Sequence, residues 1–210
     1  MESVIVAHGL WMPGWETALL RWRLGAAGFT PLLFRFATVG EGLQANAERL
    51  RQFALHAPGE TVHFVGYSLG GVVTVRMVEM QSFERPGRVV CLGSPLNGSR
   101  SALALARWPG GTRMVGKSML ELNAGGGLRP WLGERELGII AGRLAFGLGR
   151  MLGALVPPND GTVAVDETQL AGAKDHIVLP VSHTTLLFSP VVAAQACHFL
   201  RHGRFDHARP

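Results

Sequence analysis

Short apolar runs alternate along the chain with longer segments whose apolar residues recur at helical spacing. Runs of this length, rich in Val, Ile and Leu, are typical of strands buried on both faces. We expect strands at residues 3–8, 31–36, 61–66, 89–92, 136–141 and 176–181. The segments between them predict helices at 14–27 and 41–56, from residue 69 to about Gln81, and at 189–201.

Strands that alternate with helices predict an α/β fold. We expect a minimal, mostly parallel sheet of about six strands with helices on both faces. Right-handed crossovers place the carboxyl ends of such strands at one edge of the sheet, and in open parallel sheets that edge carries the functional site. Residues that follow the strands are therefore the first candidates for chemistry.

One segment interrupts the alternation. Residues 96–134 are rich in Gly, Pro, Ser, Arg and Trp and show only short helical patches, at 101–106 and 117–122. Because long loops in compact domains are usually functional or disordered, we expect a short cap or lid inserted over the active edge. An ordinary surface excursion is the alternative. The chain, 1–210, is then a single domain with one insertion.

The composition indicates the size of the core, the state of the cysteines and whether a metal site is expected. The chain has 47% hydrophobic and 17% charged residues, enough for a sizeable core. Its two cysteines, Cys91 and Cys197, lie in apolar contexts and are expected to be reduced structural thiols. The sequence has no C-x-x-C motif or His/Cys cluster, so we expect no metal and no cofactor.

The charge of the chain bears on its binding partners, and its hydropathy bears on its location in the cell. The net charge is +5, but the arginines are dispersed and no nucleic-acid-binding motif is present, so no nucleic-acid partner is expected. Weak adsorption to anionic lipid is the remaining interpretation of this charge. The start of the chain has no secretory signal pattern, and no apolar run approaches the ~20 residues of a membrane span. We therefore expect a cytoplasmic protein without stable membrane insertion.

The most informative motif is Gly66-Tyr67-Ser68-Leu69-Gly70, which has the pattern G-x-S-x-G. It follows a predicted strand and opens a predicted helix. On such a tight turn the serine oxygen stands clear of the backbone, within reach of a base and a substrate carbonyl. Gly66 and Gly70 lack side chains where strand and helix approach each other. Ser68 is thus the candidate nucleophile, although an incidental serine in a Gly-rich turn is the alternative.

A nucleophilic serine needs a base, and His183 is the best candidate among eight histidines because it directly follows the last predicted strand. The base in turn needs a carboxylate to hold its tautomer. Asp160 lies in an Asn-Asp-Gly turn before His183, and Asp166 is its rival. The order Ser68, Asp160, His183 is the chain order of α/β-hydrolase triads.

The oxyanion of a tetrahedral intermediate needs N–H donors. One is expected from Leu69, at the start of a helix. The other is expected from the loop after the first strand, where Leu10 or Trp11 can offer its amide and His8 serves as a hydrogen-bonder that fixes the loop. Trp11 and Trp15 could line an acyl pocket, or could simply pack the first helix.

These motifs together resemble the alpha/beta-hydrolase superfamily, in particular its small bacterial esterase and lipase-like members. The matching segments are HGLW at 8–11, VGYSLGG at 65–71, LGSPLNGS at 92–99, PNDGTV at 158–163 and VSHTTLLFS at 181–189. The resemblance implies Ser68 as nucleophile, Asp160 as acid, His183 as base, and Leu10 and Leu69 as the oxyanion-hole amides. The cap segment matches no pattern of the family.

The residues and the resemblance together predict a serine hydrolase of carboxylic esters that acts through an acyl-enzyme. We expect a small-molecule ester as its substrate, with a lipid-like ester among the candidates. Thioester hydrolysis or acyl transfer would use the same residues. A non-catalytic member of the fold that binds an acyl ligand or a partner is the alternative from another class.

Overall fold

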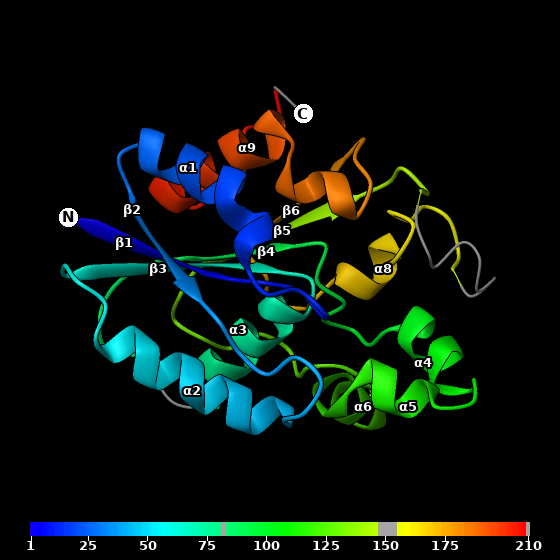
Figure 1. Cartoon of the computed structure of the whole chain (residues 1–210). Coiled ribbons are helices and arrows are strands. Elements are labelled where there is room, and N and C mark those ends of the chain that lie inside the picture. Colours follow the sequence, from blue (N-terminus) through cyan, green and yellow to red (C-terminus); the bar gives the residue numbers. More distant parts are fainter. Residues whose placement is uncertain (81–82, 147–154, 209–210) are drawn as a thin grey trace.

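The computed structural model describes residues 1–80, 83–146 and 155–208 and is built on one six-stranded sheet (Figure 1). All neighbouring strands are parallel. Across the sheet they stand in the order β2 (Thr30–Phe34), β1 (Glu2–Ala7), β3 (Thr61–Tyr67), β4 (Val89–Leu92), β5 (Leu137–Gly142) and β6 (Asp175–Leu179). The predicted α/β fold with a parallel sheet of six strands is confirmed.

Helices cover both faces of the sheet, as predicted. Helices α1 (Ala18–Ala26) and α9 (Pro190–His202) lie on one face, and α2 (Leu43–Leu55) and α3 (Leu69–Met80) lie on the other (Figure 1). Each face has its own cluster of buried apolar side chains. Leu20 and Leu24 of α1 belong to one cluster, and Ala47 and Leu50 of α2 belong to the other.

The strand order creates one point at which the chain reverses direction across the sheet. From β1 the chain crosses to β2 at one edge, whereas from β3 it proceeds through α3 to β4 on the opposite side. The loop after β1 and the turn after β3 therefore lead away from the sheet in opposite directions, and functional sites of open parallel sheets form beyond such a switch point. Leu10 lies in the first of these segments and Ser68 in the second.

Local chemistry shifts several predicted boundaries. The first helix begins as a 3-10 helix, η1 (Trp15–Thr17), before α1. Strand β6 ends at Leu179, two residues earlier than predicted, where Pro180 has no N–H for the ladder. The predicted end of α3 near Gln81 lies outside the described residues. The sequence analysis also missed three short elements, α5 (Gly111–Val115), α8 (Val165–Thr168) and η2 (Thr184–Leu187).

Residues 96–134 contain three short helices, α4 (Arg100–Ala106), α5 (Gly111–Val115) and α6 (Lys117–Ala124). Two contacts tie this segment to loops at the carboxyl edge of the sheet. The Trp11 indole Nε1 donates to the Met114 carbonyl at 2.8 Å, and Ser101 Oγ donates to the Thr162 carbonyl at 2.7 Å. The first contact reaches the loop after β1, and the second reaches the loop that carries Asp160.

Part of the same segment belongs to the core. Met119 and Leu122 of α6 are buried in the cluster that also holds residues of α2 and α3, and Trp131 is buried there as well. Leu103, Trp108 and Met114 are exposed.

Within the described ranges, no helix is both long and apolar enough to cross a membrane.

Candidate active site

Ser68 occupies a strained turn between β3 and α3. Its φ is 52°, in the left-handed region that non-glycine residues seldom adopt. Its N–H donates to the Leu92 carbonyl at 2.9 Å and its carbonyl accepts from Gly71 N at 3.1 Å. A conformation of this kind costs on the order of 1–3 kcal/mol and persists only where its surroundings impose it. The turn lifts the hydroxyl away from the sheet edge.

Two glycines allow the close approaches that this turn requires. A Cβ on Gly66 would lie 2.3 Å from the Gly71 Cα, where β3 meets the start of α3. A Cβ on Gly70 would lie 2.3 Å from the Ala7 carbonyl oxygen. Gly70 therefore brings α3 against the end of β1 rather than against its own strand, and this places the start of α3 beside the loop that carries Leu10.

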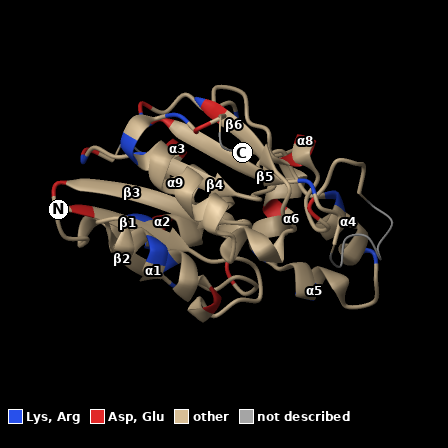
Figure 2. Ribbon diagram, turned by 90° about the horizontal axis from the view of Figure 1, so that it is seen from above, with Lys and Arg blue, Asp and Glu red and all other residues tan. Residues whose placement is uncertain are grey.

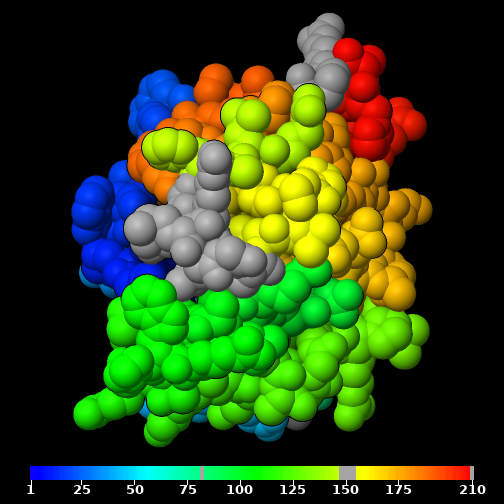
Figure 3. Space-filling model, turned by 90° about the vertical axis from the view of Figure 1, so that its right-hand side faces the viewer, coloured from blue at the N-terminus to red at the C-terminus, as the bar shows by residue number. Residues whose placement is uncertain are grey.

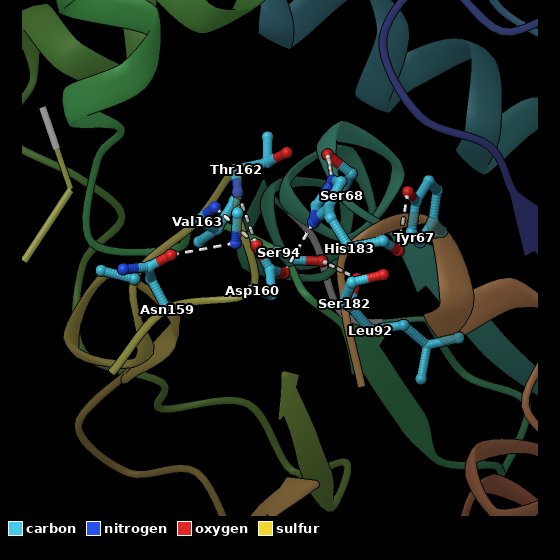
Figure 4. Close-up of polar contacts among 12 residues, drawn as sticks. Tyr67, Ser68, Leu92, Ser94, Asn159, Asp160, Thr162, Val163, Ser182 and His183 are labelled. Atoms are coloured by element: carbon cyan, nitrogen blue, oxygen red, sulfur yellow. Dashed lines mark hydrogen bonds and ion pairs between the residues drawn. The ribbon is translucent and has the colours of Figure 1, made fainter. Parts of the chain in front are cut away.

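The structure brings Ser68, His183 and Asp160 into one chain of hydrogen bonds (Figure 4). Ser68 Oγ lies 3.1 Å from His183 Nε2, and His183 Nδ1 lies 2.7 Å from Asp160 Oδ2. Because a carboxylate only accepts, Nδ1 carries the proton of the neutral ring and Nε2 is left to accept from the serine hydroxyl. This is the arrangement a general base needs.

Further contacts fix the Asp160 carboxylate in this orientation. Oδ1 accepts from the backbone N–H groups of Thr162 and Val163 at 2.9 and 2.7 Å, which leaves Oδ2 for His183. The Asp160 carbonyl accepts from His183 N at 2.8 Å. Asp160 is 1% exposed. Asp166, the rival in the sequence, is instead exposed and paired with Arg100.

The loop after β1 is held by His8. Its Nδ1 lies 3.0 Å from the Gly9 carbonyl oxygen, and its Nε2 accepts from Phe36 N at 3.4 Å. Its ring also stacks on that of Phe36. Burial lowers the pKa of His8. The residue therefore acts as a neutral link between this loop and the chain after β2, in agreement with the sequence interpretation.

The candidate oxyanion donors lie on two segments, the start of α3 and the loop after β1. Leu69 is the first residue of α3, so its N–H is among the helix donors that have no partner within the helix. In the loop after β1, the Trp11 amide donates to Thr38 Oγ1 at 3.3 Å. Of the two amides that the sequence left open, this favours Leu10 as the donor.

The sequence analysis missed two residues that support this geometry. Tyr67 is buried, donates from its hydroxyl to the His183 carbonyl at 3.1 Å, and its ring lies 5.0 Å from the His183 ring (Figure 4). Gly93 has a φ of 55°, and a Cβ there would lie 2.6 Å from Leu186 Cδ1 and 3.1 Å from Asp160 Oδ2, so any other residue would be strained. Neither role has a local sequence signal, because the partners are distant in the chain.

The predicted pocket residues are at the surface. Trp11 is 49% exposed and Trp15 is 69% exposed. A cavity of about 670 Å³ lies between β2 and α2, and another of about 280 Å³ lies at the start of α4. The triad residues line neither cavity, so neither is the acyl pocket of this site.

Among the residues described, no group of three or more His, Cys, Asp or Glu side chains could hold a metal ion.

No family model and no curated protein sequence matches the chain. Solved structures do. The mature form of a Bacillus licheniformis lipase superposes with a TM-score of 0.73 at 18% identity, over 89% of this chain and 86% of the lipase. The chain has the alpha/beta-hydrolase fold.

Two further solved structures that resemble this chain are those of an esterase and a thioesterase. A metagenomic carboxyl esterase gives a TM-score of 0.67 at 17% identity, over 87% of this chain and 64% of the esterase. A thioesterase from the prodiginine biosynthetic pathway of Streptomyces coelicolor gives 0.61 at 14% identity, over 95% of this chain and 84% of that one. At such identities the likeness concerns the fold.

Proposed function

We propose that this protein is a serine hydrolase of carboxylic esters that works through an acyl-enzyme. The observation that carries the proposal is the chain of hydrogen bonds from Ser68 through His183 to Asp160, at the switch point of a parallel sheet. The strained φ of Ser68 adds support, because strain of this kind clusters at functional sites.

In the proposed reaction, Ser68 Oγ attacks the ester carbonyl while His183 Nε2 takes the hydroxyl proton. The Leu10 and Leu69 amides donate to the oxyanion, and one such donor is worth about 10²–10³ in rate. His183 then gives its proton to the leaving alkoxide, which departs as the alcohol. Water, deprotonated by His183, attacks the acyl-enzyme and releases the carboxylic acid and free Ser68. Asp160 stabilises the imidazolium in both halves.

The first experiment measures hydrolysis of p-nitrophenyl esters over a range of acyl lengths, with Ser68→Ala as the control. We expect the substitution to lower kcat/KM by several orders of magnitude and to leave the urea unfolding midpoint nearly unchanged. A fluorophosphonate probe should label the wild-type protein at Ser68 and leave the variant unlabelled. Activity of Ser68→Ala within tenfold of wild type would sink the assignment of the nucleophile.

Thioester hydrolysis is the second candidate reaction, and the thioesterases among the structural neighbours favour it. The same three side chains would serve, since only the leaving group changes. Comparing kcat/KM for an acyl oxyester and for a thioester of the same acyl group separates the two. Adding methanol as an acceptor and measuring methyl ester formation tests for acyl transfer.

A binding protein without catalysis would need none of these proton contacts. It would show no fluorophosphonate labelling and no ester turnover, so the same experiment decides between the classes. We further propose a cytoplasmic location, which the two buried free thiols, Cys91 and Cys197, support.

A further inference from the structure

Charge is unevenly distributed in the segment that contains α4 and α5. Residues 100–117 hold four basic side chains, Arg100, Arg107, Arg113 and Lys117, and no acidic one. The whole chain has 20 Lys and Arg against 15 Asp and Glu. The segment is therefore far more basic than the rest of the molecule, although the arginines look dispersed over the full sequence.

Most of these cations lack a partner. Arg100 pairs with Asp166 and Glu167. Arg107, Arg113 and Lys117 are exposed, and their side chains form no hydrogen bond or ion pair with any residue that the structure describes. Figure 2 shows the positions of Lys and Arg at the end of the molecule where α4 and α5 lie. Three charges are thus free to meet an anion.

Large apolar side chains accompany the cations. Leu103, Trp108 and Met114 are 46%, 60% and 49% exposed. Trp11, 49% exposed, is held beside them by its hydrogen bond to the Met114 carbonyl. We call these seven residues the basic–apolar patch: Trp11, Leu103, Arg107, Trp108, Arg113, Met114 and Lys117. Residues 100–125, in green, form the lower part of the face seen in Figure 3 and project from it.

The patch adjoins the candidate active site. Trp11 follows Leu10, the candidate oxyanion donor, in the chain. On the other side of the segment, Ser101 Oγ donates to the Thr162 carbonyl in the loop that orients Asp160. A surface that binds the patch would therefore lie at the carboxyl edge of the sheet, next to Ser68.

We propose that the basic–apolar patch binds the surface of an anionic lipid bilayer. Arginine and lysine would meet the lipid phosphates, while the two tryptophans, Leu103 and Met114 would enter the interface between headgroups and acyl chains. An acidic protein could meet the same charges. The apolar side chains, however, stand singly between cations on short elements. Of the four, only Leu103 borders a cavity, the one at the start of α4, whose other lining residues are polar or glycine. This arrangement favours a fluid lipid surface. This binding goes beyond the proposed hydrolysis and does not require it.

The test measures partition of the protein to sucrose-loaded vesicles by co-sedimentation, in the Ser68→Ala background so that no lipid is consumed. We expect binding to vesicles containing phosphatidylglycerol, weaker binding to pure phosphatidylcholine, and loss of binding at 1 M salt. Because each basic residue near an anionic surface contributes about fivefold in partition, Arg107→Gln with Arg113→Gln should lower it by about 25-fold. Trp108→Ala should also lower it.

Matched controls separate the patch from the overall charge. Arg129→Gln with Arg204→Gln removes the same charge from exposed positions elsewhere, and Trp22→Ala removes a tryptophan that is 68% exposed on α1. Both should bind like the parent protein. Equal losses in the two arginine doubles, or no binding to phosphatidylglycerol vesicles, would overturn the proposal. So would binding to a soluble acidic polypeptide without binding to vesicles.

The outcome is independent of the proposed chemistry. The patch double, made with Ser68 intact, should hydrolyse the soluble p-nitrophenyl acetate at the wild-type rate. Vesicle binding without any esterase activity would reject the proposed function and leave this inference standing. Esterase activity without vesicle binding would reject this inference and leave the proposed function standing.

Discussion

At the scale of single residues, the site depends on a carboxylate that water hardly reaches. Asp160 is 1% exposed and accepts from two backbone N–H groups as well as from His183. An exposed carboxylate at the same distance would be screened and could rotate. Because Asp160 is buried and held by backbone donors, the loop around Asp160 fixes the orientation of the His183 ring.

Replacing Asp160 should therefore be far more costly than replacing Asp166. Asp160→Asn keeps the shape but can present an amide N–H to Nδ1, which favours the wrong imidazole tautomer. We expect kcat to fall by about 10³–10⁴-fold, by analogy with the best-studied triad. Asp166→Asn, whose exposed carboxylate contacts Arg100, should stay within about threefold of wild type. Steady-state kinetics on one ester checks both; a crippled Asp166 variant would reverse the assignment.

Tyr67 should act as a positioning residue for the base. Tyr67→Phe removes the hydroxyl that donates to the His183 carbonyl. A small displacement of a catalytic group can cost up to about 10²-fold, so we expect kcat to fall about tenfold with little change in KM. The unfolding free energy should fall by about 1–3 kcal/mol, because a buried carbonyl loses its donor.

The composition of the chain gives Tyr67 a spectroscopic readout. It is the only tyrosine, so 3-fluorotyrosine labelling yields a single ¹⁹F resonance. With the two rings 5.0 Å apart, that resonance should shift when the fluorophosphonate reacts with Ser68 beside His183. A resonance that does not change in this reaction, together with unchanged kcat in Tyr67→Phe, would leave Tyr67 a packing residue only.

At the scale of elements, α8 and α4 are joined by a buried glutamate. Glu167 is 4% exposed; its Oε1 accepts from Arg100 N and Nε, and its Oε2 accepts from Ala164 N at 2.7 Å. Its carbonyl accepts from Asn97 N at 2.9 Å. One residue thus connects the chain after β4, the start of α4 and the end of the Asp160 loop.

Glu167→Ala should lower the unfolding free energy by about 2 kcal/mol. The substitution leaves buried N–H donors unpaired and removes the better shielded of the two partners of Arg100. Asp166→Ala is the matched control: it removes the exposed partner of the same arginine and should cost less than about 1 kcal/mol. Urea unfolding measures both. Equal effects would show that burial of Glu167 adds nothing to this junction.

The elements also show where sequence reasoning succeeds. The alternation of strands and helices, and the G-x-S-x-G turn, follow from local periodicity and were predicted. The choice between Asp160 and Asp166 depends on a bridge between Asn159 and Ala164, which folds the loop so that Asp160 points inward. Gly93 and Tyr67 could not be found from the sequence, because their partners lie far along the chain and only packing brings them close.

At the scale of the whole molecule, buried histidines link stability to pH. His63 lies near the start of β3, at the opposite end of that strand from Ser68. Its Nδ1 accepts from Arg88 N at 3.0 Å, and its Nε2 lies 3.5 Å from the Glu2 carboxylate. Burial lowers the pKa of His63 to about 4, against the attraction of Glu2 and with a smaller contribution from Arg88 and Arg135.

This shift of the His63 pKa predicts that acid destabilises the fold at pH values above the pH range in which most carboxylates protonate. Below pH ~6.5 the unfolded chain binds a proton at His63 that the folded protein refuses until about pH 4, so the unfolding free energy must fall as the pH drops through that window. Between pH 7.5 and 5.0 the loss from this residue is about 2 kcal/mol. His63→Asn, whose side-chain oxygen can still accept from Arg88 N, should remove that part of the pH dependence, whereas His56→Asn, at an exposed position, serves as the control. Urea unfolding at the two pH values measures the difference, and an unchanged pH dependence in His63→Asn would show that His63 is charged in the folded protein.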